Sequence, residues 1–299
     1  MTMRVSVPAG FRLLPTIFSH GWCSLPPFHV EKNREALELV VALSPNHFVL
    51  VRVTQSYRTL IINFNSSKKL GNADRQYVLA TIRSCLRIDE DLSGFYDEAK
   101  RHARFRWIPK VKAGRLLRAP MVFEDVVKMI CTTNCSWALT EIMVENLCSK
   151  LGNQFDGKYS FPTPDAIADR PEKFLRKEIR AGYRSPYLLE LSRKIVKKEI
   201  DLESWRNSSL PTAELFSEIR SVKGIGPYAA GNILKLLGRY DYLGIDSLCR
   251  KRFFEIHKNG RTTSDKVIER FYEPFGTWRG LFFWMDITKS WYDQKFPLL

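Results

Sequence analysis

The spacing of apolar residues changes once along this chain, and that change limits the possible fold more than any other feature. Between residues 35 and 64 the sequence contains short runs rich in Val, Ile, Leu and Phe: EALELVVAL, HFVLVRVT and RTLIINF. The intervening SPN and QSY suit tight turns, so these runs predict an antiparallel meander. From residue 121 almost to the end, apolar residues recur instead at helical spacing.

Helices are predicted directly after the meander and again from residue 121 onward. A first helix is predicted over 73–88, with an apolar face made of Tyr77, Val78, Ile82, Cys85 and Leu86. PMVFEDVVKMI and WALTEIMVENLCSKLG are amphipathic, and Gly152 is predicted to cap the second of them. Later helices are predicted to begin near Pro171, Ser185, Pro211, Tyr228, Asp246, Ser264 and Trp278.

These patterns predict an α+β fold. A small N-terminal antiparallel β domain with a trailing helix is expected over residues 1–95, followed by a larger all-helical body over residues 96–299.

The charge balance favours a polyanionic partner. Lys and Arg total 47 against 32 for Asp and Glu, a formal net charge of +15. Nucleic acid fits such a surface first and an acidic membrane surface second. The stretch 100–118 is especially basic, with Phe105 and Trp107 between its cations. Both a solvated connecting segment and a direct DNA contact fit this stretch.

The cysteines show no metal-binding pattern. They are Cys23, Cys85, Cys131, Cys135, Cys148 and Cys249, and none forms a CxxC pair. The close pair Cys131 and Cys135 has no neighbouring His or second Cys pair to complete a zinc site. The C-terminal region also lacks the cluster of four cysteines that would hold an iron–sulfur centre. We therefore expect reduced structural thiols, no metal and no cofactor.

Nothing in the hydropathy predicts a place in a membrane. No apolar run approaches the ~20 residues that a membrane helix needs, and MTMRVSVPAGFRLLP lacks the apolar core of a secretory signal. An intracellular protein is expected, at the nucleoid in the cytoplasm of a bacterium or in the nucleus of a eukaryote.

The segment 216–254 contains the most informative pattern. An amphipathic helix leads into Lys223-Gly224-Ile225-Gly226-Pro227, and the apolar helix YAAGNILKLLG follows at once. Two glycines around one apolar residue permit a tight turn that exposes backbone N–H groups. Such groups at a helix start bind phosphate oxygens without reading sequence. An ordinary helix–turn–helix connection would also fit.

Asp246 lies 20 residues beyond Gly226 and opens the next predicted helix, DSLCRKRFF. Asp is a favoured N-cap residue, so spacing alone favours capping over catalysis.

In this order and spacing, KGIGPYAAGNILKLLG…GIDS resembles the signature of the helix-hairpin-helix (HhH-GPD) DNA glycosylases. ICTTNCSWALTEIMVENLCSKLG is similar to the helix pair with the gap-filling Asn of 8-oxoguanine glycosylases, and AGYRSPYL to their Gly-Tyr-Arg loop. PFGTWRGLFFWMD is similar to the helix behind the base pocket. The resemblance covers roughly residues 120–299. FRLLPTIFSHGW and the meander look like the β domain of the 3-methyladenine (AlkA-type) and 8-oxoguanine branches.

The resemblance implies a role for each matching residue. Asp246 would be the catalytic carboxylate, stabilising positive charge on the sugar, orienting water, or both. The residues implied in DNA binding are Lys223, Gly224, Gly226, Tyr183, Arg184 and Asn134. Those implied in the base pocket are Tyr228, Trp137 and Trp284, each of which would equally suit core packing.

Two departures from the family pattern narrow the expected reaction. Members that also cut the strand have a lysine two residues after the second hairpin glycine, where this chain has Tyr228. The Gln that reads guanine in the 8-oxoguanine branch falls at Gly280. We therefore expect a monofunctional, monomeric enzyme that removes an alkylated purine such as 3-methyladenine from double-stranded DNA. An 8-oxoguanine glycosylase with lyase activity and a non-catalytic DNA-binding module remain the alternatives.

Overall fold

The computed structural model describes residues 1–31, 35–44 and 46–295, and the chain forms two compact units. Unit 1 comprises Met1–Glu90 and Arg115–Arg206, and unit 2 comprises Asp91–Gly114 and Asn207–Leu299. Each unit is thus built from two chain segments. The predicted boundary after residue 95 falls inside helix α3 (Ser93–Arg101), and the division into domains 1–95 and 96–299 stays a prediction.

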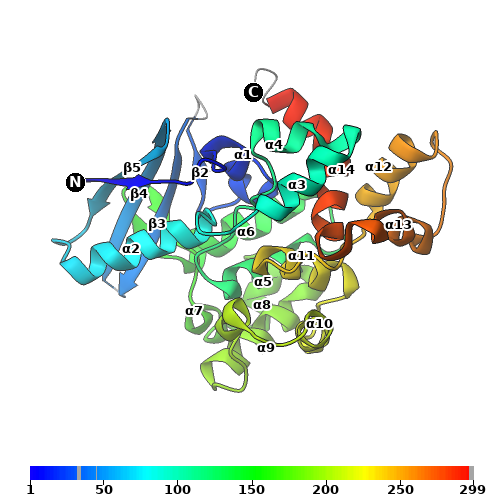
Figure 1. Ribbon diagram of the computed structural model, residues 1–299. Helices are drawn as coiled ribbons and strands as arrows, with labels where there is room; N and C mark the ends of the chain where they lie inside the picture. Colours follow the sequence, from blue (N-terminus) through cyan, green and yellow to red (C-terminus); the bar gives the residue numbers. More distant parts are fainter. Residues whose placement is uncertain (32–34, 45, 296–299) are drawn as a thin grey trace. The chain divides into compact units, whose positions relative to one another are not determined.

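Unit 1 contains a five-stranded antiparallel sheet in the order β1-β5-β4-β3-β2 (Figure 1). The strands are β1 (Thr2–Ser6), β2 (His29–Val30), β3 (Leu37–Ser44), β4 (His47–Ser56) and β5 (Thr59–Ser66). The pairing of β3 with β4 and of β4 with β5 confirms the predicted meander. Pro45, in the predicted SPN turn, lies outside the described residues. The edge strands β1 and β2 were not predicted.

Alternation of apolar residues explains why these runs form a sheet with one buried face. On β4 the side chains of Val49, Val51 and Val53 are buried, and Val51 lies opposite Leu39 while Val53 lies opposite Ile62. Side chains two residues apart on a strand point to the same face. The period of two therefore places all three valines on one side of the sheet.

Helix α2 (Asn72–Cys85) confirms the helix predicted after the meander. Val78, Ile82 and Cys85 are buried, as expected. The prediction was wrong for Tyr77, which is 54% exposed. Tyr77 precedes Val78 by one residue, and one residue turns a helix by about 100°. Its side chain therefore leaves the buried stripe.

The rest of unit 1 is mainly helical. Its helices are α1 (Leu13–Ile17), α5 (Val122–Thr132), α6 (Trp137–Leu151), α7 (Pro164–Ala168), α8 (Glu172–Lys177) and α9 (Ser185–Val196). Its short elements are the 3-10 turns η1 (Gly21–Ser24), η3 (Gly182–Arg184) and η4 (Glu203–Asn207), and the hairpin β6 (Gln154–Phe155) and β7 (Lys158–Tyr159).

Gly152 ends α6 as predicted, but with φ −80° rather than a left-handed conformation. A Cβ there would overlap the Ser160 carbonyl oxygen, so close backbone packing explains the glycine.

Unit 2 consists of helices only, among the residues that the structure describes. They are α3 (Ser93–Arg101), η2 (Ala103–Phe105), α4 (Trp107–Val111), α10 (Thr212–Ser221), α11 (Pro227–Leu237), α12 (Ser247–His257), α13 (Asp265–Tyr272), η5 (Glu273–Trp278) and α14 (Arg279–Lys295). The N-cap residues of α10, α12 and α13 are Pro211, Asp246 and Ser264, which confirms the predicted starts.

Aromatic packing joins the two segments of unit 2. The ring of Phe95, on α3, lies 4.7 Å from that of Phe282, on α14, and the Phe282 ring stacks on Phe275 at 4.2 Å between centroids. The buried Asp286 carboxylate accepts hydrogen bonds from Arg104 and from the Tyr272 hydroxyl, the latter at 2.7 Å. These contacts explain why 91–114 belongs with the C-terminal helices.

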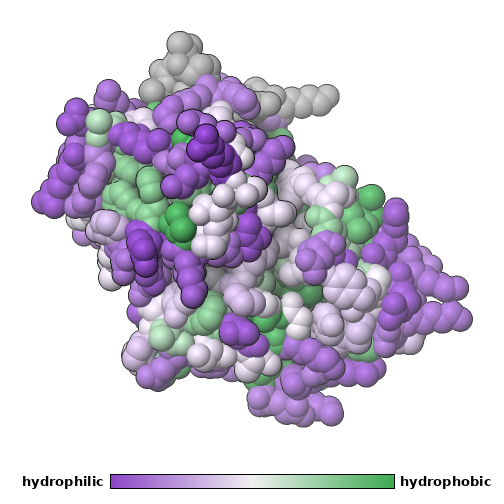
Figure 2. All heavy atoms as spheres, turned by 90° about the vertical axis from the view of Figure 1, so that its right-hand side faces the viewer, coloured by the Kyte–Doolittle hydropathy of each residue, from purple (hydrophilic) through white to green (hydrophobic). Residues whose placement is uncertain are grey.

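The surface shown in Figure 2 is mostly hydrophilic, with smaller hydrophobic areas between. Exposed hydrophobic side chains on α12 and α13 are Leu248, Ile256, Val267 and Phe271. Among residues 1–31, 35–44 and 46–295, no helix combines the length and apolar character that crossing a lipid bilayer requires.

Candidate active site and nucleic-acid interface

The turn between α10 and α11 forms as its glycines predict. Gly224 has φ +92°, a conformation that favours glycine, and Ile225 is buried beneath the turn. Gly226 has φ −87° and ψ 179°, which any residue can adopt, and a Cβ on it would meet no heavy atom within 4 Å. The turn itself therefore requires a glycine at 224 but not at 226.

The start of α11 is suited to bind an anion. Gly226 is its N-cap residue and makes no side-chain cap hydrogen bond, and Pro227 occupies the first turn. Those N–H groups and the positive end of the helix dipole favour a phosphate oxygen. Lys223 is exposed beside them and adds a positive charge.

Asp246 is the N-cap of α12, which confirms the structural role predicted for it. Its Oδ1 accepts a hydrogen bond from the Cys249 backbone N–H at 2.7 Å. The residue is half-buried, so its carboxylate is held in one orientation without being sealed from solvent. A fixed, accessible carboxylate of this kind can stabilise a positive charge that develops beside it.

The loop between α11 and α12 passes unusually close to its neighbours. A Cβ on Gly231, within α11, would lie 3.0 Å from Gly244 of the loop. A Cβ on Gly280, at the start of α14, would overlap the Tyr242 carbonyl oxygen. The Gly280 N–H also donates to the Tyr240 carbonyl at 2.7 Å. Glycines at 231 and 280 therefore let both helices touch the loop that leads to Asp246.

Lys235 is a residue near this site that the sequence analysis missed. It is only 2% exposed, and its Nζ donates to the Leu243 carbonyl at 2.8 Å. Burial lowers the pKa of Lys235 to about 8, against the attraction of the Asp246 carboxylate. One signal was present, since Lys235 is the sole charged residue in the apolar helix PYAAGNILKLL.

Unit 1 brings together three other residues that the sequence singled out. Asn134 is exposed at the turn between α5 and α6, with φ +47°. The hydroxyl of Tyr183 donates to the carbonyl of the adjacent Thr133 at 3.2 Å, and the Arg184 guanidinium binds the same carbonyl. Segments about fifty residues apart thus meet around one backbone oxygen.

Tyr183 and Arg184 differ sharply in exposure, at 45% and 3%. The Arg184 guanidinium lies 4.5 Å from the centroid of the Tyr183 ring, so the buried arginine supports an exposed aromatic side chain. Contact of either residue with DNA stays a prediction. Because Tyr183 is the more exposed of the two, it is the better candidate for contact with DNA. Arg184 would then hold the loop in place.

The predicted base-pocket residues have mixed environments. In unit 1, Trp137 is 40% exposed, donates to Glu141 at 2.9 Å and covers Gly21. In unit 2, Tyr228 and Trp284 are both half-buried, and the Trp284 ring lies 5.2 Å from the Lys235 ammonium. Their roles in binding a base stay predictions.

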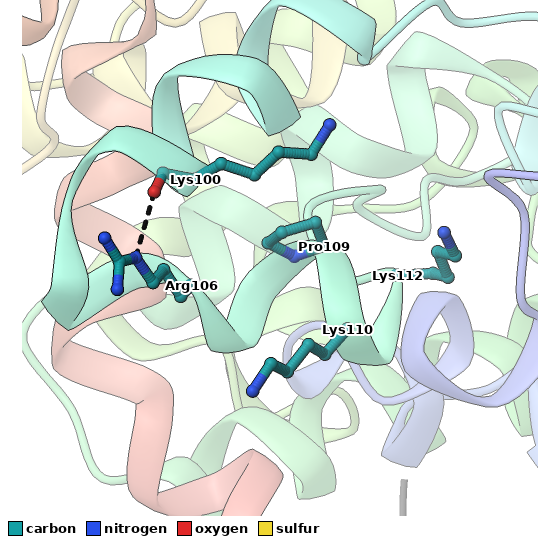
Figure 3. Close-up of a pocket in the computed structure, with 5 residues that line it drawn as sticks. All are labelled: Lys100, Arg106, Pro109, Lys110 and Lys112. Atoms are coloured by element: carbon teal, nitrogen blue, oxygen red, sulfur yellow. Dashed lines mark hydrogen bonds between the residues drawn. The ribbon is translucent and has the colours of Figure 1, made fainter.

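A second cationic feature of unit 2 is a surface pocket of about 480 Å³ over α3 and α4 (Figure 3). It is lined by Lys100, Arg106, Pro109, Lys110 and Lys112. The three lysine side chains extend in different directions rather than converging on one point (Figure 3). This arrangement, the α3–α4 basic groove, suits an extended polyanion better than one small anion.

Five of the six cysteines are buried, as expected of structural thiols, and Cys135 is half-buried. Cys131 is buried, and burial raises the pKa of its thiol to about 12. Across residues 1–31, 35–44 and 46–295, no group of three or more His, Cys, Asp or Glu side chains is arranged to hold a metal ion.

The HhH-GPD superfamily of base excision DNA repair proteins has a sequence profile that matches residues 127–277, about half of the chain. A yeast (Saccharomyces cerevisiae) N-glycosylase/DNA lyase is 27% identical over 61% of this chain and 52% of its own length. A Bacillus subtilis DNA-3-methyladenine glycosylase is 21% identical over 85% of this chain and 88% of its own. The chain thus spans about half the length of the yeast relative.

Solved structures share the fold. MBOgg1 in complex with a low affinity DNA ligand has a TM-score of 0.76 at 21% identity, covering 97% of this chain and 96% of that chain. The 3-methyladenine DNA glycosylase of Archaeoglobus fulgidus has a TM-score of 0.75 at 21% identity, covering 97% and 99%. MBOgg1 and the Archaeoglobus fulgidus 3-methyladenine DNA glycosylase therefore both share the architecture of this chain.

Proposed function

Because this chain belongs to the HhH-GPD superfamily of base excision DNA repair proteins, we propose that it is a monofunctional DNA glycosylase. It flips a damaged purine out of double-stranded DNA and removes it by hydrolysis, with an alkylated base such as 3-methyladenine as the favoured substrate. It acts as a monomer and needs no cofactor.

One observation carries the proposal: unit 2 holds a glycine turn suited to bind phosphate and a fixed carboxylate, in the order and spacing of the family signature. The uncapped start of α11 supplies N–H groups for the DNA backbone, and Asp246 is anchored at the start of α12. Backbone contacts of this kind position DNA but do not read its sequence. Selectivity must then come from the base pocket.

Asp246 supports the cleavage of the bond between C1′ of the sugar and the purine nitrogen. As that bond breaks, its electron pair leaves with the base and positive charge develops on the sugar. The Asp246 carboxylate stabilises this charge and orients the water that adds to C1′. The water gives up a proton to the solvent as it adds. An alkylated purine is already a good leaving group because it carries a positive charge, which the departing electron pair neutralises.

Tyr228 supports a monofunctional reaction. The family members that cut the strand use a lysine at this position to form a Schiff base with C1′. A phenol cannot form that imine. Water is then the nucleophile, and strand cleavage at the abasic product requires added alkali.

Gly280 supports an alkylated purine over 8-oxoguanine. This position corresponds to the Gln that reads guanine in the 8-oxoguanine branch. Even a Cβ at 280 would overlap the Tyr242 carbonyl oxygen, so the backbone here has no room for that side chain. Tyr228 and Trp284, the proposed base-pocket residues of unit 2, would favour an electron-poor base by stacking and cation–π attraction.

On the DNA side, Tyr183 is the proposed wedge and Asn134 the proposed gap filler. Both are exposed; Asn134 directly follows Thr133, whose carbonyl accepts a hydrogen bond from the Tyr183 hydroxyl. Base flipping costs a few kcal/mol of stacking and pairing, part of which an inserted aromatic ring replaces.

The experiment that tests this function measures base release from duplexes containing 3-methyladenine, 7-methylguanine, hypoxanthine, uracil or 8-oxoguanine, with and without alkali. We expect release of alkylated bases and strand cleavage only after alkali. Release of 8-oxoguanine with spontaneous nicking would favour the bifunctional activity that the yeast relative is named for. Binding without release of any base would favour a non-catalytic DNA-binding module.

A further inference from the structure

Lys235 is a buried cation in a helix that otherwise buries apolar residues. Its neighbours Ile233, Leu234 and Leu236 are all buried, and Lys235 itself is 2% exposed. Removing an ammonium group from water costs several kcal/mol unless hydrogen bonds and nearby charges compensate. A leucine or methionine would fill the same space without that cost, so packing alone does not account for the charge.

The ammonium is bound to the loop that carries Asp246. Its Nζ donates to the carbonyl of Leu243, three residues before Asp246, at 2.8 Å. The same loop is held at Tyr240 by the Gly280 N–H and at its end by the bond between Asp246 and Cys249. Lys235 is the attachment in the middle of the loop.

A carboxylate and an aromatic ring, from α12 and α14, lie near this ammonium in unit 2. The Asp246 carboxylate, at the start of α12, stabilises its charged form electrostatically. The Trp284 ring on α14 lies 5.2 Å from Nζ, within cation–π range. The lysine thus links the proposed catalytic carboxylate to a proposed base-pocket residue.

We propose that Lys235 is a positioning residue of this site: its ammonium anchors the α11–α12 loop at Leu243 and holds the Asp246 carboxylate in its working position. This inference rests on the proposed function for the reaction, but the anchoring itself is a property of the loop and can be measured without any substrate.

The protonation of Lys235 gives a stability signature. Its pKa is about 8 in the folded protein against an ordinary value of 10.5. The unfolded chain therefore holds this proton more tightly, and the contribution of Lys235 to stability rises as pH increases from about 8 to 10.5. Below pH 8 Lys235 is charged in the folded protein, so burying this charge lowers the free energy of unfolding by its full amount.

The test compares Lys235→Met, which is uncharged and similar in size, with Lys235→Gln, which keeps an N–H donor. Lys266→Met, at an exposed position on α13, is the matched control. Single-turnover release of 3-methyladenine should fall about tenfold to a hundredfold in Lys235→Met, with duplex affinity unchanged and partial recovery in Lys235→Gln. Amide hydrogen exchange of the α11–α12 loop should accelerate in Lys235→Met alone.

Thermal stability and pH separate positioning from plain structural support. We expect Lys235→Met to melt no lower than the parent protein at pH 7. The parent protein's rate should also show an alkaline decline near pH 8 that Lys235→Met lacks. A large loss of melting temperature in parallel with activity would instead make Lys235 an ordinary structural residue and overturn the inference.

The remaining outcomes distinguish this inference from the proposed function. Unchanged loop exchange in Lys235→Met would refute the anchoring whether or not the protein releases any base. Unchanged release by Lys235→Met beside an inactive Asp246→Asn would refute the inference and leave the proposed function standing. A protein–DNA adduct trapped by borohydride and lost in Lys235→Met would make the amine a nucleophile, which also overturns a positioning role.

Discussion

At the scale of single residues, Asp246 combines two roles that can be separated chemically. As an N-cap it needs only an oxygen that accepts the Cys249 N–H, whereas stabilising a cationic sugar needs a negative charge. An asparagine keeps the oxygen and loses the charge. The two functions therefore predict different results for substitutions of the same residue.

We expect Asp246→Asn to lower the single-turnover rate of base release by at least about a hundredfold, with duplex affinity and melting temperature close to those of the parent. Asp246→Ala should be equally inactive and in addition less stable by about 1 kcal/mol, because the cap is lost. Equal rates for Asp246→Asn and the parent would refute the catalytic assignment.

The two hairpin glycines make a second matched pair. Gly226→Ala should leave the free energy of unfolding nearly unchanged, because its φ of −87° is ordinary and its Cβ would point into open space. It should nevertheless weaken binding to any duplex, since the methyl group would meet the phosphate. Gly224→Ala should destabilise the fold by about 1 kcal/mol, because residue 224 has φ +92°.

Duplex affinity at several salt concentrations and chemical denaturation measure these two effects independently. If Gly226→Ala binds duplexes as tightly as the parent at every salt concentration, the backbone of this turn is not the phosphate site.

At the scale of elements, η3 and the α5–α6 turn form a small supported platform in unit 1. Arg184 is buried against Thr133, and Tyr183 stands exposed above it. Tyr183→Ala should slow base release with little change in stability, because an exposed ring is removed. Arg184→Ala should lower the melting temperature, because a buried side chain is removed and the Thr133 carbonyl loses its charged hydrogen-bond donor. Similar melting losses in both variants would argue against the wedge and support a purely structural loop.

Which elements the sequence could predict depends on how local their signals are. The starts of α12 and α13 follow from Asp246 and Ser264, because N-cap preferences operate within one turn. Helices α3 and α4 were missed, since their aromatic residues pack against the distant α14 rather than against neighbours in sequence. The two-residue strand β2 is fixed by its pairing with β3 rather than by its own composition.

The candidate site divides in the same way. The hairpin glycines and Asp246 could be identified because the features that matter are turn chemistry and residue order along one short segment. The importance of Lys235 could not, because it depends on burial and on a contact with Leu243 across a loop. A lone lysine in an apolar helix is an ambiguous signal until its surroundings are known.

At the scale of the whole molecule, the net charge of +15 predicts duplex binding that weakens steeply as salt rises. The net charge alone does not identify the Lys and Arg side chains that contact phosphates. The α3–α4 basic groove is a testable candidate, because Lys110 and Lys112 make no ion pair within the part of the chain that the structure describes. Their charges are therefore available to an external polyanion.

Replacing both Lys110 and Lys112 with Ala should reduce the slope of log affinity against log salt by about 1.8, at about 0.9 for each lost phosphate contact. Lys197→Ala with Lys198→Ala, at the exposed end of α9, removes the same charge elsewhere and is the matched control. If the two double variants change the slope equally, only the overall field acts and the groove is a solvated surface. A change confined to the groove variant, with the rate of base release from saturated enzyme unaltered, would place phosphates over α3 and α4 and extend the DNA contact beyond the α10–α11 turn.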